Sequence, residues 1–110
     1  MDATNEKIGS IDDLQYNKNV LCFLRSKLDD FAIDCFKMVA RQHNHNGLIK
    51  SKMIEDYSSK RYIYEKAFNF LEAQGFIEIK ELGNMKPYFI TTRGRQLVDL
   101  ILNEKNQHEN

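Results

Sequence analysis

Apolar residues recur with the spacing of an α-helix across residues 59–75. One face of this helix takes positions i, i+3, i+4 and i+7, which are Tyr64, Ala67, Phe68 and Leu71. Ser58 or Ser59 can accept hydrogen bonds from the amides of the first turn, and Gly75 can adopt the left-handed conformation that ends a helix. The pattern therefore predicts an amphipathic helix with both ends marked.

The pattern changes to that of an extended chain after Gly75. Residues 76–80 are rich in aromatic and β-branched side chains, Gly83 and Asn84 favour a turn, and residues 87–91 read as a returning strand. These segments predict a β-hairpin with a loop of about six residues.

A last helix follows the hairpin. Thr91 can cap its first turn, and Gly94 weakens that start only slightly. Its apolar stripe has helical spacing and consists of Leu97, Val98, Leu100, Ile101 and Leu102. The residues from Asn103 onward are polar, and we expect them to fray.

Two more helices are predicted before this motif, over residues 20–28 and 31–42. Asp29 and Asp30 suit the positive end of the second one, whose inward side chains are Phe31, Ile33, Cys35, Phe36, Met38 and Val39. After a turn at 43–47, the short extended segment 48–49 is expected to pair with the hairpin, and residues 51–57 to form another helix.

This order predicts a mainly α fold with a small β-hairpin (α+β), a winged helix-turn-helix with two preceding N-terminal helices. A length of 110 residues and 42% hydrophobic content suit a single core. We divide the chain into a polar, partly ordered arm (1–18), the winged-helix domain (19–103) and a flexible tail (104–110).

Charge is unevenly distributed although the formal net charge is zero. Residues 50–95 hold nine Lys and Arg against six Asp and Glu, so the predicted motif is the basic part of the chain. Cys22 and Cys35 are expected to be reduced and buried, and no apolar run approaches the roughly 20 residues that span a bilayer. We therefore expect a soluble, cytoplasmic protein with no membrane partner.

A winged helix-turn-helix inserts the N-terminal turn of its second motif helix into the major groove of DNA. Here that turn carries Ser58, Ser59, Lys60, Arg61 and Tyr62, and the planar guanidinium of Arg61 can bind the O6 and N7 atoms of guanine. Further along the helix, Lys66 can reach a phosphate or base. Wing and closing-helix contacts to phosphates are expected from Lys80, Asn84, Lys86 and Arg93.

Each of these assignments has a simpler alternative. The basic side chains of Lys60, Arg61 and Lys66 could simply form a solvated helix face that pairs with Asp56 or Glu65. Tyr62 could likewise be an ordinary surface tyrosine. His43 and His45 suggest a metal site with Cys35 or Cys22, but no further ligand has suitable spacing. We expect no metal or other cofactor, and, since no catalytic motif occurs, no enzymatic activity.

Ile63 and Phe70 lie on a face of the helix beside its core stripe. Three arrangements would bury these two side chains: contact with the N-terminal helix, contact with a second subunit, or a core that extends to this face of the helix. If the cover is a second copy, the two helices would present their first turns together, and the protein acts as a homodimer.

The segments 54–102, 71–77 and 88–95 resemble winged-helix DNA-binding proteins. The small size, the two preceding helices and the apolar Ile63 and Phe70 look like the TubR family, the centromere-binding adaptors of plasmid and phage DNA segregation. This resemblance implies dimerisation through the DNA-reading helices, cooperative arrays on repeated sites and recruitment of a tubulin-like GTPase. It also implies that Lys60, Arg61 and Tyr62 enter the groove and that Lys86 belongs to the wing.

Two other functions fit the same sequence. A transcriptional repressor of the MarR or PadR kind would dimerise through its closing helix and bind one palindrome. A winged helix that binds only protein would give no salt-sensitive binding of duplex DNA.

Overall fold

The computed structural model describes residues 13–109. Its helices and strands follow one another as α2 (Lys18–Ser26), α3 (Asp30–Gln42), α4 (Lys50–Met53), α5 (Arg61–Ala73), β1 (Ile77–Ile79), β2 (Tyr88–Ile90) and α6 (Thr92–Glu109). This order of helices with one antiparallel hairpin confirms the predicted α+β, winged-helix-like fold class.

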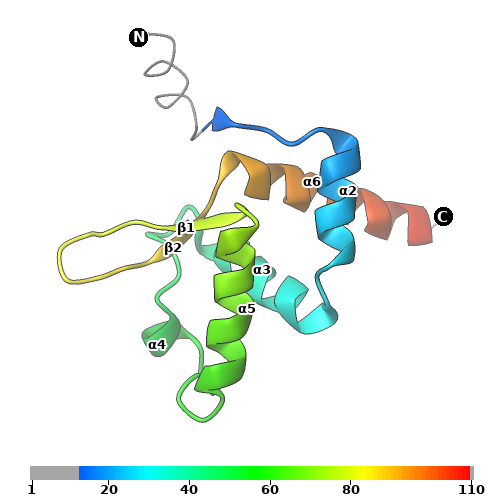
Figure 1. The fold of residues 1–110 in the computed structure, drawn as a ribbon. Coiled ribbons are helices and arrows are strands. Elements are labelled where there is room, and N and C mark those ends of the chain that lie inside the picture. The colour runs from blue at the N-terminus through cyan, green and yellow to red at the C-terminus, as the bar shows by residue number, and fades with distance from the viewer. Residues whose placement is uncertain (1–12, 110) are drawn as a thin grey trace, which may run out of the picture.

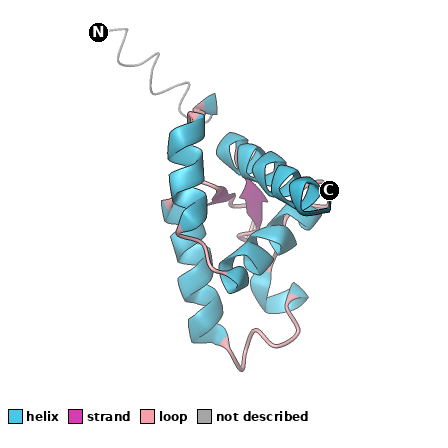
Figure 2. Ribbon diagram, turned by 90° about the vertical axis from the view of Figure 1, so that its right-hand side faces the viewer, coloured by secondary structure: helices cyan, strands magenta, loops and turns pink. Residues whose placement is uncertain are grey.

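The core lies where α3, α5 and the hairpin meet. Figure 2 shows the two short strands in the middle of the molecule, with helices on either side. The least exposed residues come from these elements, from the turn before β1 and from α6, and they include Cys35, Phe36, Val39, Phe68, Leu71, Phe76, Ile77, Tyr88 and Leu97. The helical stripes identified in the sequence therefore point into one shared core, as expected from their spacing.

Helix α5 ends as the sequence predicts but begins differently. Gly75 has a φ of 85°, and the amides of Gly75 and Phe76 donate to the carbonyls of Glu72 and Leu71, which is the Schellman arrangement. The expected cap by Ser58 or Ser59 is wrong. Lys60 stands at the N-cap without a side-chain hydrogen bond, because the Ser59 hydroxyl donates to the carbonyl of Asp56 instead.

The helix predicted over 51–57 is also shorter than expected. Helix α4 spans only Lys50–Met53, and Ile54 already has the extended values φ −102° and ψ 114°. Asp56 then accepts the amide of Lys60 at its carbonyl, which keeps the connection in turns up to the start of α5. The Ser59 hydroxyl and the Lys60 amide therefore both bond to the Asp56 carbonyl, in turns that precede α5 rather than in a continuation of α4.

The hairpin is more tightly closed than a loop of six residues. Beyond the paired strands, Leu82 and Met85 exchange two backbone hydrogen bonds of 2.9 and 3.0 Å. Gly83, with φ 64°, takes the first position of the two-residue turn between them, as in type II′ turns. Leu48 pairs with Tyr88 through two bonds of 2.9 Å, so the expected third extended segment is confirmed as a single bridge.

Helix α6 begins as predicted, because the Thr91 hydroxyl accepts the amide of Gly94 at 3.0 Å. It continues well past the expected end near Asn103 and reaches Glu109. At the other end of the chain, α2 begins at Lys18 with Asn17 as its cap. Residues 1–12 of the predicted arm and Asn110 of the tail lie outside the described residues.

Tyr16 attaches the chain before α2 to the rest of the fold. Its hydroxyl donates to the carbonyl of Gln74 at 2.6 Å, and its backbone exchanges two bonds of 2.9 Å with the Gln96 amide. Its ring also packs edge-on against Phe76. The predicted arm, residues 1–18, therefore includes a residue, Tyr16, that is attached to the rest of the fold.

Gly94 allows α6 to lie close to the backbone at Phe76, just before β1. A Cβ atom at this position would be 2.3 Å from the carbonyl oxygen of Phe76 and 3.0 Å from Cβ of Ile90. A backbone oxygen cannot move aside as a flexible side chain does. The sequence-based expectation that Gly94 only weakens the helix therefore misses its packing role.

We predict that Gly94→Ala lowers the free energy of unfolding by about 1–3 kcal/mol, through overpacking. This is opposite to the usual gain of roughly 1 kcal/mol when Ala replaces Gly within a helix. Urea unfolding measures the change. Asn103→Ala, at an exposed position of the same helix, is the control and should be neutral or slightly stabilising; a stabilised Gly94→Ala variant would contradict the close approach.

Candidate nucleic-acid interface

The segment that leads into α5 lies on the outside of the molecule. Ser58, Ser59, Lys60, Arg61 and Tyr62 are all exposed, and Tyr62 is 80% exposed. Figure 1 shows this end of α5 next to α4 and away from the packed end of the helix at β1. The first turn of α5 is therefore accessible, as insertion into a groove requires.

Lys50 fixes this helix against α4 and the sheet. Its ammonium group lies 2.6 Å from a carboxylate oxygen of Glu65 and 5.0 to 5.8 Å from the ring centres of Tyr57, Phe68 and Tyr88. The side chain of Lys50 is only 17% exposed, so its charge depends on these partners. Sequence reasoning missed Lys50, because nothing in the spacing of a single lysine indicates an aromatic enclosure.

Glu65 receives two hydrogen bonds in this cluster. Besides Lys50, the Tyr57 hydroxyl donates to the same carboxylate oxygen. The Lys50 and Tyr57 hydrogen bonds hold the pKa of Glu65 below its ordinary value, and the Glu65 carboxylate raises the pKa of Tyr57. Glu65 therefore stays ionised, facing the cluster.

Asp56 makes a second link to α5. Its carboxylate accepts a hydrogen bond of 2.7 Å from the Tyr64 hydroxyl and forms an exposed ion pair of 3.4 Å with Lys60. The Tyr64 bond is the main cause of a lowered pKa for Asp56, and it raises the pKa of Tyr64 to about 12. These contacts set the angle at which the connection enters the helix.

The predicted basic residues of α5 differ in what they contact. Lys60 pairs with Asp56, as the simpler alternative proposed. Glu65 pairs with Lys50, and within residues 13–109 neither Arg61 nor Lys66 forms an ion pair. Arg61 and Lys66 are both exposed. Arg61 lies close enough to Tyr57 and Glu65 to act on both of them in the direction of a lower pKa, whereas Lys66 lies beside the apolar groove described below.

The predicted wing residues are exposed, whereas Arg93 is not. Lys80, Asn84 and Lys86 lie on the hairpin, and the Lys80 ammonium lies 4.8 Å from the ring centre of Phe89. Arg93 is 9% exposed, and its guanidinium donates to the carbonyls of Gly75 and Leu14 at 2.9 and 2.8 Å. We therefore withdraw Arg93 from the candidate interface, because its donors hold the end of α5 and the arm.

Ile63 and Phe70 remain at the surface, 51% and 42% exposed. They line a groove of about 920 Å³ beside Phe31, with Lys27 and Lys66 also on its walls. Neither a wider core nor helix α2 covers them within the described chain. Of the three covers considered for this face, a second subunit remains as a proposal.

The two cysteines and the histidines give no metal site in the described residues. Both cysteines are free thiols, but Cys22 is exposed, which corrects the expectation that both are buried. Burial raises the pKa of Cys35 to about 12, so this thiol remains protonated. Within residues 13–109, no helix has the length and apolar content needed to cross a membrane.

Comparison with models of protein families, with curated proteins and with solved structures finds no match for this chain. The geometry itself defines the class of fold, a small α+β domain with helices before and after a two-stranded hairpin. Any finer assignment depends on the exposed helix start, the hairpin and the apolar groove described above.

We predict that Glu65→Gln lowers the free energy of unfolding by about 1–2 kcal/mol at pH 7, because Lys50 loses its ionic partner. The pKa of Glu65 is lowered in the folded state, so its contribution is complete above its ordinary pKa of 4.5 and is lost as the pH falls. The deficit of the variant should therefore shrink in acid.

Urea unfolding at a series of pH values measures this dependence. Glu72→Gln is a matched control, since Glu72 lies exposed on the same helix. A deficit that stays constant down to pH 3, or one equal to that of the control, would exclude an ionic role for Glu65.

Proposed function

We propose that this protein binds double-stranded DNA in a sequence-specific manner as a homodimer, with α5 as the helix that enters the major groove. The observation that supports this most is the exposed turn 58–62 at the start of a helix fixed by Lys50 and Asp56. A helix start that is both exposed and rigidly held can place a side chain against a base edge.

Arg61 is the residue we assign to base recognition. Its guanidinium lies in the first turn of α5 and is exposed, and its planar donors match the O6 and N7 atoms of guanine. Lys60 and Lys66 would contact phosphates, and Tyr62 a sugar or a thymine methyl group. On the wing, Lys80, Asn84 and Lys86 would follow the backbone. Because the net charge is zero, binding would depend on these few cations and on dimerisation.

The apolar groove supports a dimer formed through α5. Two copies that bury Ile63 and Phe70 against each other would also bring their Arg61 side chains to one stretch of duplex. This is the arrangement expected of a centromere-binding adaptor, so we propose a role in plasmid or phage DNA segregation with a tubulin-like GTPase as partner. Such a protein would act in the cytoplasm.

A transcriptional repressor of the MarR or PadR kind is the second candidate. The long closing helix α6 favours it, because Leu102 is 52% exposed there and could support dimerisation at that end. The two functions differ in their DNA: an adaptor binds tandem repeats cooperatively, next to a gene for a tubulin-like GTPase, whereas a repressor binds one palindrome.

We predict that Arg61→Ala weakens binding to a selected duplex by about 1–3 kcal/mol and relaxes the preference at one base position. Arg61→Lys should keep part of the affinity but lose that preference, since lysine has no planar fork. Lys86→Ala should weaken all sequences alike. Fluorescence anisotropy with duplexes selected from a random pool, at several salt concentrations, measures these effects.

The matched control is Lys105→Ala, in the C-terminal part of α6 on the side of the molecule opposite the hairpin (Figure 1). It should leave binding unchanged. Equal and small effects of Arg61→Ala and Lys86→Ala would show that α5 is not the inserted element. If no duplex binds in a salt-sensitive manner, DNA binding is excluded and a protein-interaction module is the remaining function.

The dimer is tested by a pair of charge substitutions. We predict that Phe70→Glu gives monomers in sedimentation velocity at concentrations where the unmodified chain is dimeric, while Leu102→Glu leaves the dimer intact. Both positions are exposed in the single chain, so neither change disturbs the core. If Leu102→Glu gives monomers and Phe70→Glu leaves the dimer intact, the dimer contact lies on α6, which favours the repressor.

A further inference from the structure

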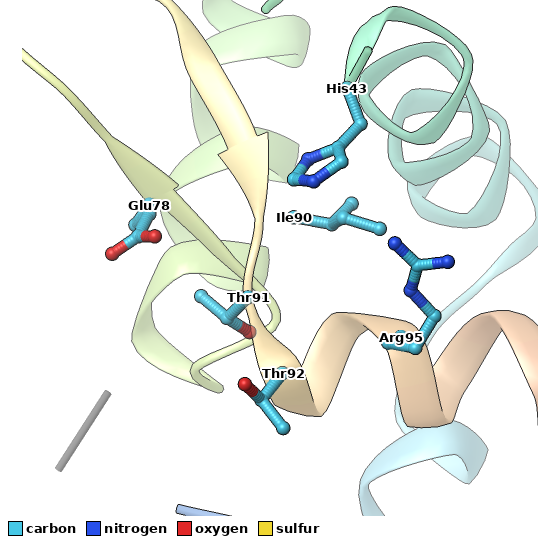
Figure 3. A pocket seen from close by; sticks show the side chains of 6 residues that line it. All are labelled: His43, Glu78, Ile90, Thr91, Thr92 and Arg95. Atoms are coloured by element: carbon cyan, nitrogen blue, oxygen red, sulfur yellow. The ribbon is translucent and has the colours of Figure 1, made fainter. Parts of the chain in front are cut away.

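A cavity of about 290 Å³ lies between the end of α3 and the start of α6, at the C-terminal end of β2 (Figure 3). It is lined by His43, Glu78, Ile90, Thr91, Thr92 and Arg95. Pockets for drug-sized ligands commonly measure about 300–1,000 Å³, so this cavity lies at the lower limit and suits a small ion or a single chemical group.

Two nitrogen-bearing side chains approach this cavity from different elements. His43 comes from the turn after α3, and Arg95 from the first turn of α6; Figure 3 shows both side chains extending toward the space around Ile90. The carboxylate of Glu78 is turned away from them in the same view. Within residues 13–109 Arg95 forms no ion pair, so the described chain does not neutralise its charge.

The imidazole ring of His43 lies near two cationic side chains, Arg95 and Lys80. Its Nδ1 atom is buried and has no hydrogen-bond partner among the described residues, while the ring packs edge-on against Phe89. Burial, then Arg95 and Lys80, lower the pKa of His43, whereas Glu78 acts in the opposite direction. A negative ligand in the cavity would reverse the two cationic effects.

We propose that this cavity binds one phosphate-type oxyanion, held by the guanidinium of Arg95 and the protonated ring of His43. A tetrahedral anion accepts hydrogen bonds from several directions, which suits donors on two elements better than a planar carboxylate does. The first turn of α6 adds a favourable field, because the cavity lies against Thr92 at that helix end. The site is independent of the function proposed for α5.

Sulfate is the most direct probe, since it does not titrate between pH 5 and 8. We expect sulfate to raise the pKa of His43, followed by NMR of the histidine ring, and to saturate with concentration. Chloride at equal ionic strength should give a smaller change without saturation. His45 is an internal control, because it is exposed and lies outside the cavity lining.

Arg95→Gln tests whether the site is a specific one. Arg95 is exposed, so the variant should fold normally, and it should bind sulfate at least about tenfold more weakly because a charged hydrogen bond is lost. Lys105→Gln removes the same charge elsewhere on α6 and should bind sulfate like the unmodified chain. An equal response to chloride, an equal response of His45, or full binding by Arg95→Gln would overturn the proposal.

A second experiment identifies the source of the phosphate group. If a duplex raises the pKa of His43 and prevents the sulfate response, the natural occupant is a backbone phosphate of a nucleic acid. If duplex leaves the sulfate response of His43 unchanged, the occupant is a small phosphate-bearing molecule. Both outcomes support an oxyanion site, and the sulfate measurement remains valid even if the protein binds no DNA.

Discussion

The ammonium group of Lys50 is the charge on which the arrangement of the outer helix depends. It lies among three aromatic rings that belong to the connection before α5, to α5 itself and to β2, and it pairs with Glu65. A buried charge is costly unless ring faces and a carboxylate surround it, so these elements must meet at one point. The direction of α5, and with it the exposed turn at its start, follows from that requirement.

Much of the fold could be predicted because its signals are local. The faces of α3 and α5 follow from apolar spacing, the end of α5 from Gly75, and the start of α6 from Thr91. The start of α5 and the length of α4 could not be predicted in the same way. There, hydrogen bonds to Asp56 compete with the helix, and a serine near a helix start can serve either purpose.

The sequence could predict those residues of the candidate site whose exposure follows from their position on a helix. The turn 58–62 is exposed as expected, and so are Ile63 and Phe70. Nothing in the sequence distinguishes Arg93 from an exposed arginine. In the folded chain its guanidinium donates to the carbonyl groups of Gly75 and Leu14, which are distant in the sequence. The cavity at His43 and Arg95 was missed for the same reason, because only the folded chain brings these two residues together.

The contacts around Gly75 also have a consequence for how the protein is made. The carbonyls of Gln74 and Gly75, directly after α5, accept hydrogen bonds from Tyr16, which precedes α2, and from Thr91 and Arg93 at the start of α6. During synthesis on the ribosome, Thr91 and Arg93 emerge 16 and 18 residues after Gly75. Until then the Gly75 carbonyl must be satisfied by water, so the native arrangement at this end of α5 forms only once the start of α6 has emerged.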